Sequence, residues 1–169
     1  MVIAIAIGKY DCDSIDAQFQ NLDSIDNDIK NIVRLFGVTL NYRIIPNYSI
    51  NEQIKTYWSK QEIFELLKKQ AKYLNKSVQN NKHDSVIVII SCHGIQDHIV
   101  TSDYKLINKD TIYRIFSVDY PSLRNIPGIF MYDCCDGDND MIREERIESF
   151  GNTTPSKSSL ESRSDGKHF

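Results

Sequence analysis

The stretch Ser85–Ser91, with the sequence SVIVIIS, decides the fold class of this chain. Its interior is continuously apolar and rich in β-branched residues, which is typical of a strand covered on both faces of a parallel sheet. Similar runs occur at Val2–Ile7 and Gly128–Tyr132, and a shorter one at Tyr42–Ile45. Because helical patterns separate these runs, the sequence predicts an α/β fold with a mainly parallel sheet flanked by helices.

Three stretches between the strands are predicted to be helices. Apolar residues repeat at helical spacing over Ile25–Phe36, and we expect Gly37 to end that helix as its C-cap. A capping box formed by Ser59 and Glu62 predicts the start of a second helix, and a third, shorter one is expected near Lys109–Phe116.

Two segments are predicted to lie outside the core. The polar and acidic stretch Tyr10–Ser24 is expected to form a surface loop. Beyond Ser149 the sequence is rich in Ser and nearly free of apolar residues. We therefore expect residues 1–142 to form one domain and residues 143–169 to be a flexible linker or tail.

The composition is that of an ordinary globular protein, with 169 residues of which 41% are hydrophobic and 25% charged. Its 20 basic and 23 acidic side chains give no basic excess, so we expect no nucleic-acid partner. The apolar N-terminus lacks the features of a signal peptide and is far shorter than the roughly 18 apolar residues of a membrane span. Four irregularly spaced cysteines do not make a disulfide framework. These features predict a cytoplasmic protein with reduced thiols and no membrane partner.

Reactive residues follow two of the predicted strands. Cys92 and His93 come directly after Ser85–Ser91, and Cys134 and Cys135 follow Gly128–Tyr132 after one Asp. Ligands bind at the carboxyl ends of strands in open α/β sheets, so a thiol and an imidazole meeting there could form a catalytic pair. The imidazole would take the thiol proton and later return a proton to the leaving group.

The alternation of side chains along a strand selects one cysteine as the nucleophile. If Asp133 and Cys135 face the site, Cys134 points back to the core. On the other strand, His93 faces the site whereas Cys92 is buried. Cys135 is therefore the predicted nucleophile, and the other two cysteines are predicted to be packing residues.

Main-chain groups close to the thiol complete the predicted site. Gly94 and Gly137 flank it at points where the backbone must approach a substrate closely. The main-chain N–H groups of Gly94 and Cys135 could hold a developing oxyanion.

These strand ends resemble those of the caspase-like cysteine peptidases, which include caspases, metacaspases and paracaspases. A hydrophobic strand ending S-x-H-G is followed by D-x-C-x-G, with Cys135 placed 42 residues after His93. VIAIAIGKY with IDNDIKNIVRLF, and YPSLRNIPGIFMYDCC, are also similar to segments of that family. The resemblance extends from Val2 to about Gly137 and covers the large-subunit region. It implies a caspase–haemoglobinase fold and hydrolysis of peptide bonds through an acyl-enzyme, with His93 as base and acid and Cys135 as nucleophile.

Departures from the caspase pattern indicate which substrate residue the site prefers. Caspases carry Gln two residues before the catalytic Cys and a basic residue before the first helix, to bind a substrate Asp. This chain has Asp133 at the first position and no Lys or Arg between Lys9 and Lys30. It has instead Asp28, similar to the acidic-pocket residues of metacaspases, and Ser91 is a further pocket candidate. Two carboxylates without a cation favour Arg or Lys before the scissile bond.

Other features leave an alternative function open. Asp136 places negative charge beside the thiol and opposes thiolate formation. Only Asp136–Phe169 follow the catalytic strand, which is short for the small-subunit part of the family and leaves a sheet edge uncovered. The alternative is a catalytically weak or inactive caspase-like module that pairs with or regulates an active homologue. Expected partners are protein or peptide substrates, and a small subunit or second caspase-like chain.

No cofactor is needed for this chemistry, and none is expected. The acidic cluster of Asp136, Asp138 and Asp140 could hold calcium, but its spacing matches no EF-hand, and a solvated acidic loop is the preferred interpretation. A third reading, a flavodoxin-like ligand-binding protein, lacks a glycine-rich phosphate loop after the first strand.

Overall fold

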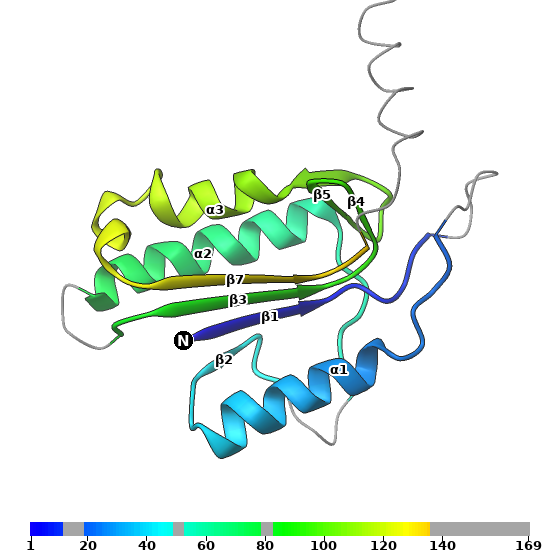
Figure 1. Cartoon of the computed structure of the whole chain (residues 1–169), viewed down its shortest axis with the longest axis horizontal. Coiled ribbons are helices and arrows are strands. Elements are labelled where there is room, and N and C mark those ends of the chain that lie inside the picture. Colours follow the sequence, from blue (N-terminus) through cyan, green and yellow to red (C-terminus); the bar gives the residue numbers. More distant parts are fainter. Residues whose placement is uncertain (12–18, 49–52, 79–82, 136–169) are drawn as a thin grey trace, which may run out of the picture. The chain divides into compact units, whose positions relative to one another are not determined.

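A sheet of four parallel strands forms the centre of the computed structural model, which describes residues 1–11, 19–48, 53–78 and 83–135. Its strand order is β2-β1-β3-β7 (Figure 1). The register pairs Ala6 with Ser91 and Ser91 with Asp133, so three strands end level at one edge of the sheet. The strands are β1 (Val2–Ala6), β2 (Ile44–Ile45), β3 (Val86–Ser91) and β7 (Gly128–Asp133).

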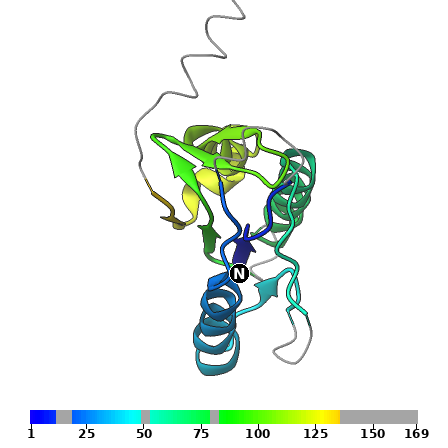
Figure 2. The same ribbon diagram turned by 90° about the vertical axis from the view of Figure 1, so that its right-hand side faces the viewer.

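The predicted α/β class is confirmed, and the first strand is as buried as its sequence indicates. All five residues of β1 are fully buried. Helices lie on both faces of the sheet, with α1 on one side and α2 and α3 on the other (Figures 1 and 2). Val2, Ala4 and Ala6 pack on the α1 side, in the same cluster as Ile25 and Ile29. A continuous apolar strand is therefore required, because both of its faces meet a helix layer.

The first helix continues past the predicted end. The α-helix α1 (Ile25–Ile32) runs directly into a π-helical segment, η1 (Val33–Thr39). The prediction of Gly37 as the C-cap is therefore wrong. A Cβ atom on Gly37 would lie 3.2 Å from Cγ1 of Ile44, so this glycine allows η1 to pack closely against β2.

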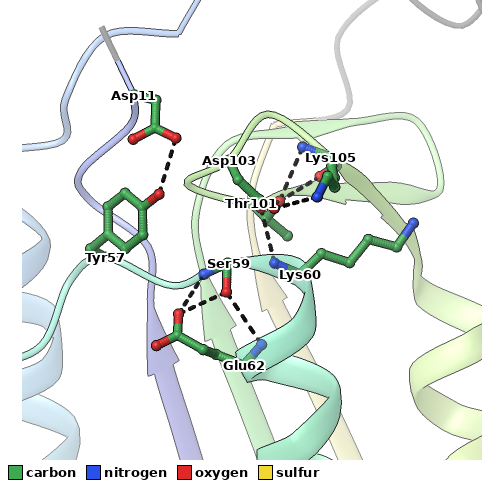
Figure 3. A network of polar contacts seen from close by, with 8 residues as sticks. All are labelled: Asp11, Tyr57, Ser59, Lys60, Glu62, Thr101, Asp103 and Lys105. Atoms are coloured by element: carbon green, nitrogen blue, oxygen red, sulfur yellow. Dashed lines mark hydrogen bonds and ion pairs between the residues drawn. The ribbon is translucent and has the colours of Figure 1, made fainter. Parts of the chain in front are cut away.

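The second helix begins at the predicted capping box. The N–H of Ser59 donates to Oε2 of Glu62 over 2.9 Å, and the N–H of Glu62 donates to Oγ of Ser59 over 3.3 Å (Figure 3). These bonds satisfy main-chain donors at the start of α2 (Lys60–Val78). Its inward stripe is fully buried and consists of Ile63, Leu67, Ala71 and Leu74.

Along the chain, a small antiparallel sheet and a third helix come after β3 and before β7. The small sheet has the order β4-β5-β6 and leads into α3 (Lys109–Ser117). Oδ1 of Asn108 caps this helix by accepting from the N–H of Asp110 over 2.8 Å. The remaining elements are β4 (Gly94–Ile95), β5 (His98–Val100), β6 (Leu106–Asn108) and the 3-10 turn η2 (Pro121–Asn125).

The last strand, β7, is at the sheet edge and is only half covered, in contrast to the predicted buried strand. Phe130 packs on the α3 side, with its ring centroid 5.5 Å from that of Tyr113 and 5.9 Å from that of Phe116. On the other face Ile129 and Met131 are 52% and 49% exposed. The reason is that α1 packs on β1, which lies two strands away from β7.

The described residues all belong to one compact unit, Met1–Asp138. A second unit, Asn139–Phe169, lies outside them, so the predicted boundary after residue 142 stays a prediction. Over the described ranges, no helix combines the length and the apolar character that crossing a membrane requires.

Candidate active site

The ends of β3 and β7 bring two of the predicted pocket residues together. Oγ of Ser91 donates to Oδ2 of Asp133 over 3.0 Å. One residue later, the N–H of Cys92 donates to the carbonyl oxygen of Asp133 over 3.1 Å, so the pairing of the strands continues to this point. Ser91 is buried and Asp133 is exposed, so the hydroxyl fixes the direction of a carboxylate that solvent reaches.

The third predicted pocket residue, Asp28, lies on a different element. It is a half-buried residue in the first turn of α1. Within the described ranges, no hydrogen bond or ion pair joins Asp28 to Ser91 or Asp133. Its role in a shared pocket stays a prediction.

Three thiols gather at the same strand ends, and they differ in exposure. Cys92 is buried, Cys134 is half-buried and Cys135 is exposed. The side chains of Cys92 and Cys134 are hydrogen-bonded, and this bond together with burial raises the pKa of Cys92 well above its usual range. A thiol with a raised pKa is a poor nucleophile at neutral pH. The exposed thiol of Cys135 is thus the one that a substrate can reach, and its catalytic role stays a prediction.

Gly94 lies directly against the chain that carries these thiols. A Cβ atom at this position would be 2.6 Å from the carbonyl oxygen of Cys135 and 2.9 Å from both Cβ and Sγ of Cys134. Those distances are far below van der Waals contact, so only glycine fits here without a shift of the main chain. The expected approach of a substrate to the backbone at Gly94 stays a prediction.

The imidazole of His93 is oriented by a main-chain carbonyl. Its Nε2 atom lies 2.8 Å from the carbonyl oxygen of Gln20. Because a carbonyl oxygen only accepts, Nε2 carries the hydrogen, and Nδ1 is the basic nitrogen of the neutral ring. A side chain that can take up a proton at a defined atom therefore lies at the end of β3, beside the strand that leads to Cys135.

Aromatic residues from the segment after β1 surround this histidine. The imidazole centroid lies 5.1 Å from the ring of Tyr10 and 5.0 Å from that of Phe19. Tyr10 is only 4% exposed, so the prediction that it belongs to a surface loop is wrong. Its burial has a physical reason, because its hydroxyl bonds two main-chain groups, the carbonyl of Ile7 and the N–H of His93.

Sequence reasoning missed Tyr10, Phe19 and Gln20 as site residues. The one available signal was Tyr10 itself, a large aromatic residue two positions after Gly8 at the end of a buried strand. Gln20 contributes its main-chain carbonyl, which every residue type has, so the sequence gives no signal for this role. Gly137 and the acidic cluster of Asp136, Asp138 and Asp140 lie outside the described residues.

The described part of the chain has no group of three or more His, Cys, Asp or Glu side chains arranged to hold a metal ion. What it presents at the sheet edge is an exposed thiol, an oriented imidazole and a carboxylate fixed by a hydroxyl. Chemically, a thiol and an oriented base can perform acyl transfer by nucleophilic catalysis.

Comparisons with known proteins concern the fold and the family of this chain. A solved structure of caspase-1 from Spodoptera frugiperda superimposes with a TM-score of 0.64 at 18% sequence identity, which shows a shared fold. The match covers 82% of this chain and 48% of that one, so the chain spans about half the length of its structural relative. A search of curated proteins found no match.

The family comparison covers nearly the whole chain. The family model described as caspase domain matches residues 1–167. This match confirms the predicted resemblance to caspase-like proteins, whereas the likeness of Asp28 to the acidic-pocket residues of metacaspases stays a prediction. Because its fold is that of a caspase and the family match spans residues 1–167, the chain belongs to the caspase domain family, a family of cysteine peptidases.

Proposed function

We propose that this chain carries the catalytic residues of a cysteine endopeptidase that cleaves after Arg or Lys. The observation that supports this most strongly is the imidazole of His93, whose Nε2 is bound to the Gln20 carbonyl at the end of β3, the strand that pairs with the one leading to the exposed Cys135. That bond leaves Nδ1 of His93 as the proton acceptor.

The proposed reaction has two steps. Sγ of Cys135 attacks the scissile carbonyl carbon while its proton passes to Nδ1 of His93, and the C–N bond then breaks as the imidazolium returns the proton to the leaving amine. In the second step water attacks the thioester carbon while His93 takes its proton, and the C–S bond then breaks as the imidazolium returns that proton to the leaving thiolate of Cys135. The Gln20 carbonyl stabilises the imidazolium, because a hydrogen bond from a charged donor is stronger than one from a neutral donor.

Main-chain N–H groups supply the electrostatic part of this mechanism. In the proposal, those of Gly94 and Cys135 donate to the oxyanion of the tetrahedral intermediate. The contact between Gly94 and the Cys135 main chain supports this role, because it holds the two segments together at one point.

The proposed preference for a basic substrate residue depends on the charge of the pocket. Ser91 directs the carboxylate of Asp133, and a guanidinium or ammonium group would pair with that carboxylate. Asp28 is the second proposed acidic group. A caspase-type preference for Asp would instead bring two carboxylates together at Asp133.

Hydrolysis of fluorogenic peptides tests this function directly. Peptides that differ only in Arg or Asp before the reporter are given to the wild-type chain and to its Cys135→Ala and Cys134→Ala variants. We expect turnover of the Arg peptide by wild type and Cys134→Ala, and none by Cys135→Ala. Turnover of the Asp peptide alone would overturn the specificity, and activity that survives Cys135→Ala would overturn the mechanism.

A second function, a caspase-like module that works with another chain, is favoured by the exposed face of β7. Ile129 and Met131 are half exposed on a strand that has β3 as its one pairing partner among the described residues. Exposed strand edges are sites at which another strand can add. A small subunit or a second caspase-like chain fits this edge. Absence of turnover by the chain alone, restored by such a partner, would favour this reading.

A further inference from the structure

The main chains of β1 and β3 separate at the residue that precedes the candidate base. The N–H of Ile7 donates to the carbonyl of Ser91 over 2.9 Å, which is the last direct bond between these strands. In a regular parallel ladder, the next bond would run from the N–H of His93 to the carbonyl of Ile7. That direct bond is replaced in this structure by a side chain.

The hydroxyl of Tyr10 takes the place of the missing bond. It donates to the carbonyl oxygen of Ile7 over 3.0 Å and accepts from the N–H of His93 over 3.0 Å. One ladder bond has thus become two, with an oxygen atom inserted between the strands. Each partner is satisfied, which matters because unpaired polar groups are costly inside a protein. The inserted hydroxyl therefore sets how far His93 lies from β1 as the chain leaves the sheet.

The ring of Tyr10 also contacts the imidazole. The ring centroid of Tyr10 lies 5.1 Å from that of His93, and the centroid of Phe19 lies 5.0 Å from that of His93. The ring of Tyr104 lies 6.1 Å from those of Tyr10 and Phe19, and its hydroxyl donates to the carbonyl of Phe19 over 3.2 Å. The next carbonyl along the chain, that of Gln20, binds Nε2 of the imidazole. One set of packed rings thus links Tyr10 to the group that fixes the tautomer.

Bonds on both sides of Tyr10 hold it in place. The N–H of Lys9 donates to the carbonyl of Thr56 over 3.2 Å, and the N–H of Asp11 donates to the carbonyl of Ser102 over 3.0 Å. The hydroxyl of Tyr57 donates to Oδ2 of Asp11 over 3.0 Å, in the polar network of Figure 3. The segment that carries Tyr10 is therefore bound to two neighbouring loops, and its hydroxyl is a fixed point for His93.

We propose that Tyr10 is a positioning residue for His93: its hydroxyl spaces the His93 main chain from β1, and its ring holds the imidazole against the Gln20 carbonyl. The inference rests on the proposed function only for its effect on catalysis. Its structural part, the control of the imidazole by Tyr10, holds for the chain whether or not it cleaves peptides.

A hydroxyl deletion with a matched control tests the catalytic part. Tyr10→Phe removes the bridging oxygen and keeps the ring. Tyr48→Phe is the control, because the Tyr48 hydroxyl also donates to a β1 carbonyl, that of Ala4, over 3.0 Å. We expect Tyr10→Phe to lower kcat about 10- to 100-fold with KM nearly unchanged, as misplacement of a reacting group does. Tyr48→Phe should leave kcat within about twofold, because the Tyr48 hydroxyl bonds Ala4 and not His93, so no reacting group is misplaced. Equal losses in both variants would overturn the proposal.

Nitrogen NMR of the histidines tests the structural part without any turnover. Spectra are recorded on chains that carry Cys135→Ala, with the His93 signals assigned by a His93→Gln variant. We expect one dominant Nε2–H tautomer in this background, its loss or averaging on adding Tyr10→Phe, and no change on adding Tyr48→Phe. A tautomer that is insensitive to Tyr10→Phe would overturn the proposal. A chain that cleaves no peptide but shows the expected spectra would refute the proposed function alone.

Discussion

Substitution of Gly94 by Ala probes the contact between the two strand ends that carry the candidate dyad. The added Cβ would lie 2.6 Å from the carbonyl oxygen of Cys135, about 0.8 Å inside the 3.4 Å at which ordinary contact begins. It would also lie 2.9 Å from Cβ of Cys134, so a rotation of side chains alone does not relieve the clash. The main chain that carries Cys135 must therefore move by nearly 1 Å.

The size of this shift sets two expected effects. A misplacement of about 1 Å in a reacting group lowers catalysis by about 100-fold, which we expect in kcat for the Arg peptide. Overpacking costs about 1–3 kcal/mol of stability. At ~2–4 °C per kcal/mol, the Tm should fall by roughly 2–12 °C. The two losses are expected together, since one displacement causes both.

Gly128→Ala is the matched control, at the other end of β7. Its Cβ would lie 3.2 Å from Cε2 of Phe130 and 3.7 Å from Cγ1 of Val86, which are side-chain atoms that can yield. Peptide hydrolysis and thermal unfolding by circular dichroism are measured for both variants. A wild-type kcat in Gly94→Ala, or a loss of activity in Gly128→Ala as large as that in Gly94→Ala, would contradict the described contact at Gly94.

Three further predictions concern α2 and its start, and urea denaturation checks each of them. Leu67→Ala removes a fully buried side chain and should lower the free energy of unfolding by about 2–5 kcal/mol; a loss well below this range would contradict the described packing of α2. Ser59→Ala removes the N-cap hydroxyl and should cost about 0.5–2 kcal/mol, whereas an unchanged stability would mean that the capping box is not formed in solution. The hydrogen bond from Lys55 and that from the Ser59 N–H hold the pKa of Glu62 down, at about 2 against its usual 4.5. The Glu62 carboxylate thus contributes stability that is present above pH 4.5 and is lost as the pH falls through 2. Glu62→Gln should therefore be less stable than wild type at neutral pH and should converge with it near pH 2, and a difference that grows on acidification would count against this assignment.

The strands were predictable because their residues face helices on both sides. Val2–Ala6 and residues 86–90 show this as unbroken apolar runs, which no amphipathic helix would produce. The half-exposed face of Gly128–Asp133 was not predictable in the same way. Its apolar residues are those of a buried strand, but whether a strand is covered depends on elements elsewhere in the fold.

Local signals were also overridden by tertiary packing at the end of the first helix. Gly37 carries the usual C-cap signature, yet the helix continues through it to Thr39. The close contact with Ile44 explains why a glycine stands there, and this contact is invisible in a single sequence.

The positions of the candidate residues His93 and Cys135 at strand ends were predictable, because parallel strands end at a common edge. Their catalytic roles stay predictions. The residues that hold His93 in place could not be found in this way. Gln20 acts through its carbonyl, and Tyr10 stands in a polar stretch whose composition indicates a loop.

Alkylation of the thiols tests most directly whether His93 and Cys135 work as a pair. Iodoacetamide is added at neutral pH to wild type, Cys134→Ala and His93→Ala, and the labelled position is identified by peptide mass spectrometry. We expect preferential labelling of Cys135 in wild type and in Cys134→Ala, and a rate at least about tenfold lower in His93→Ala. Equal labelling of Cys134 and Cys135, or a Cys135 rate that does not change without His93, would show that the two residues do not work as a pair.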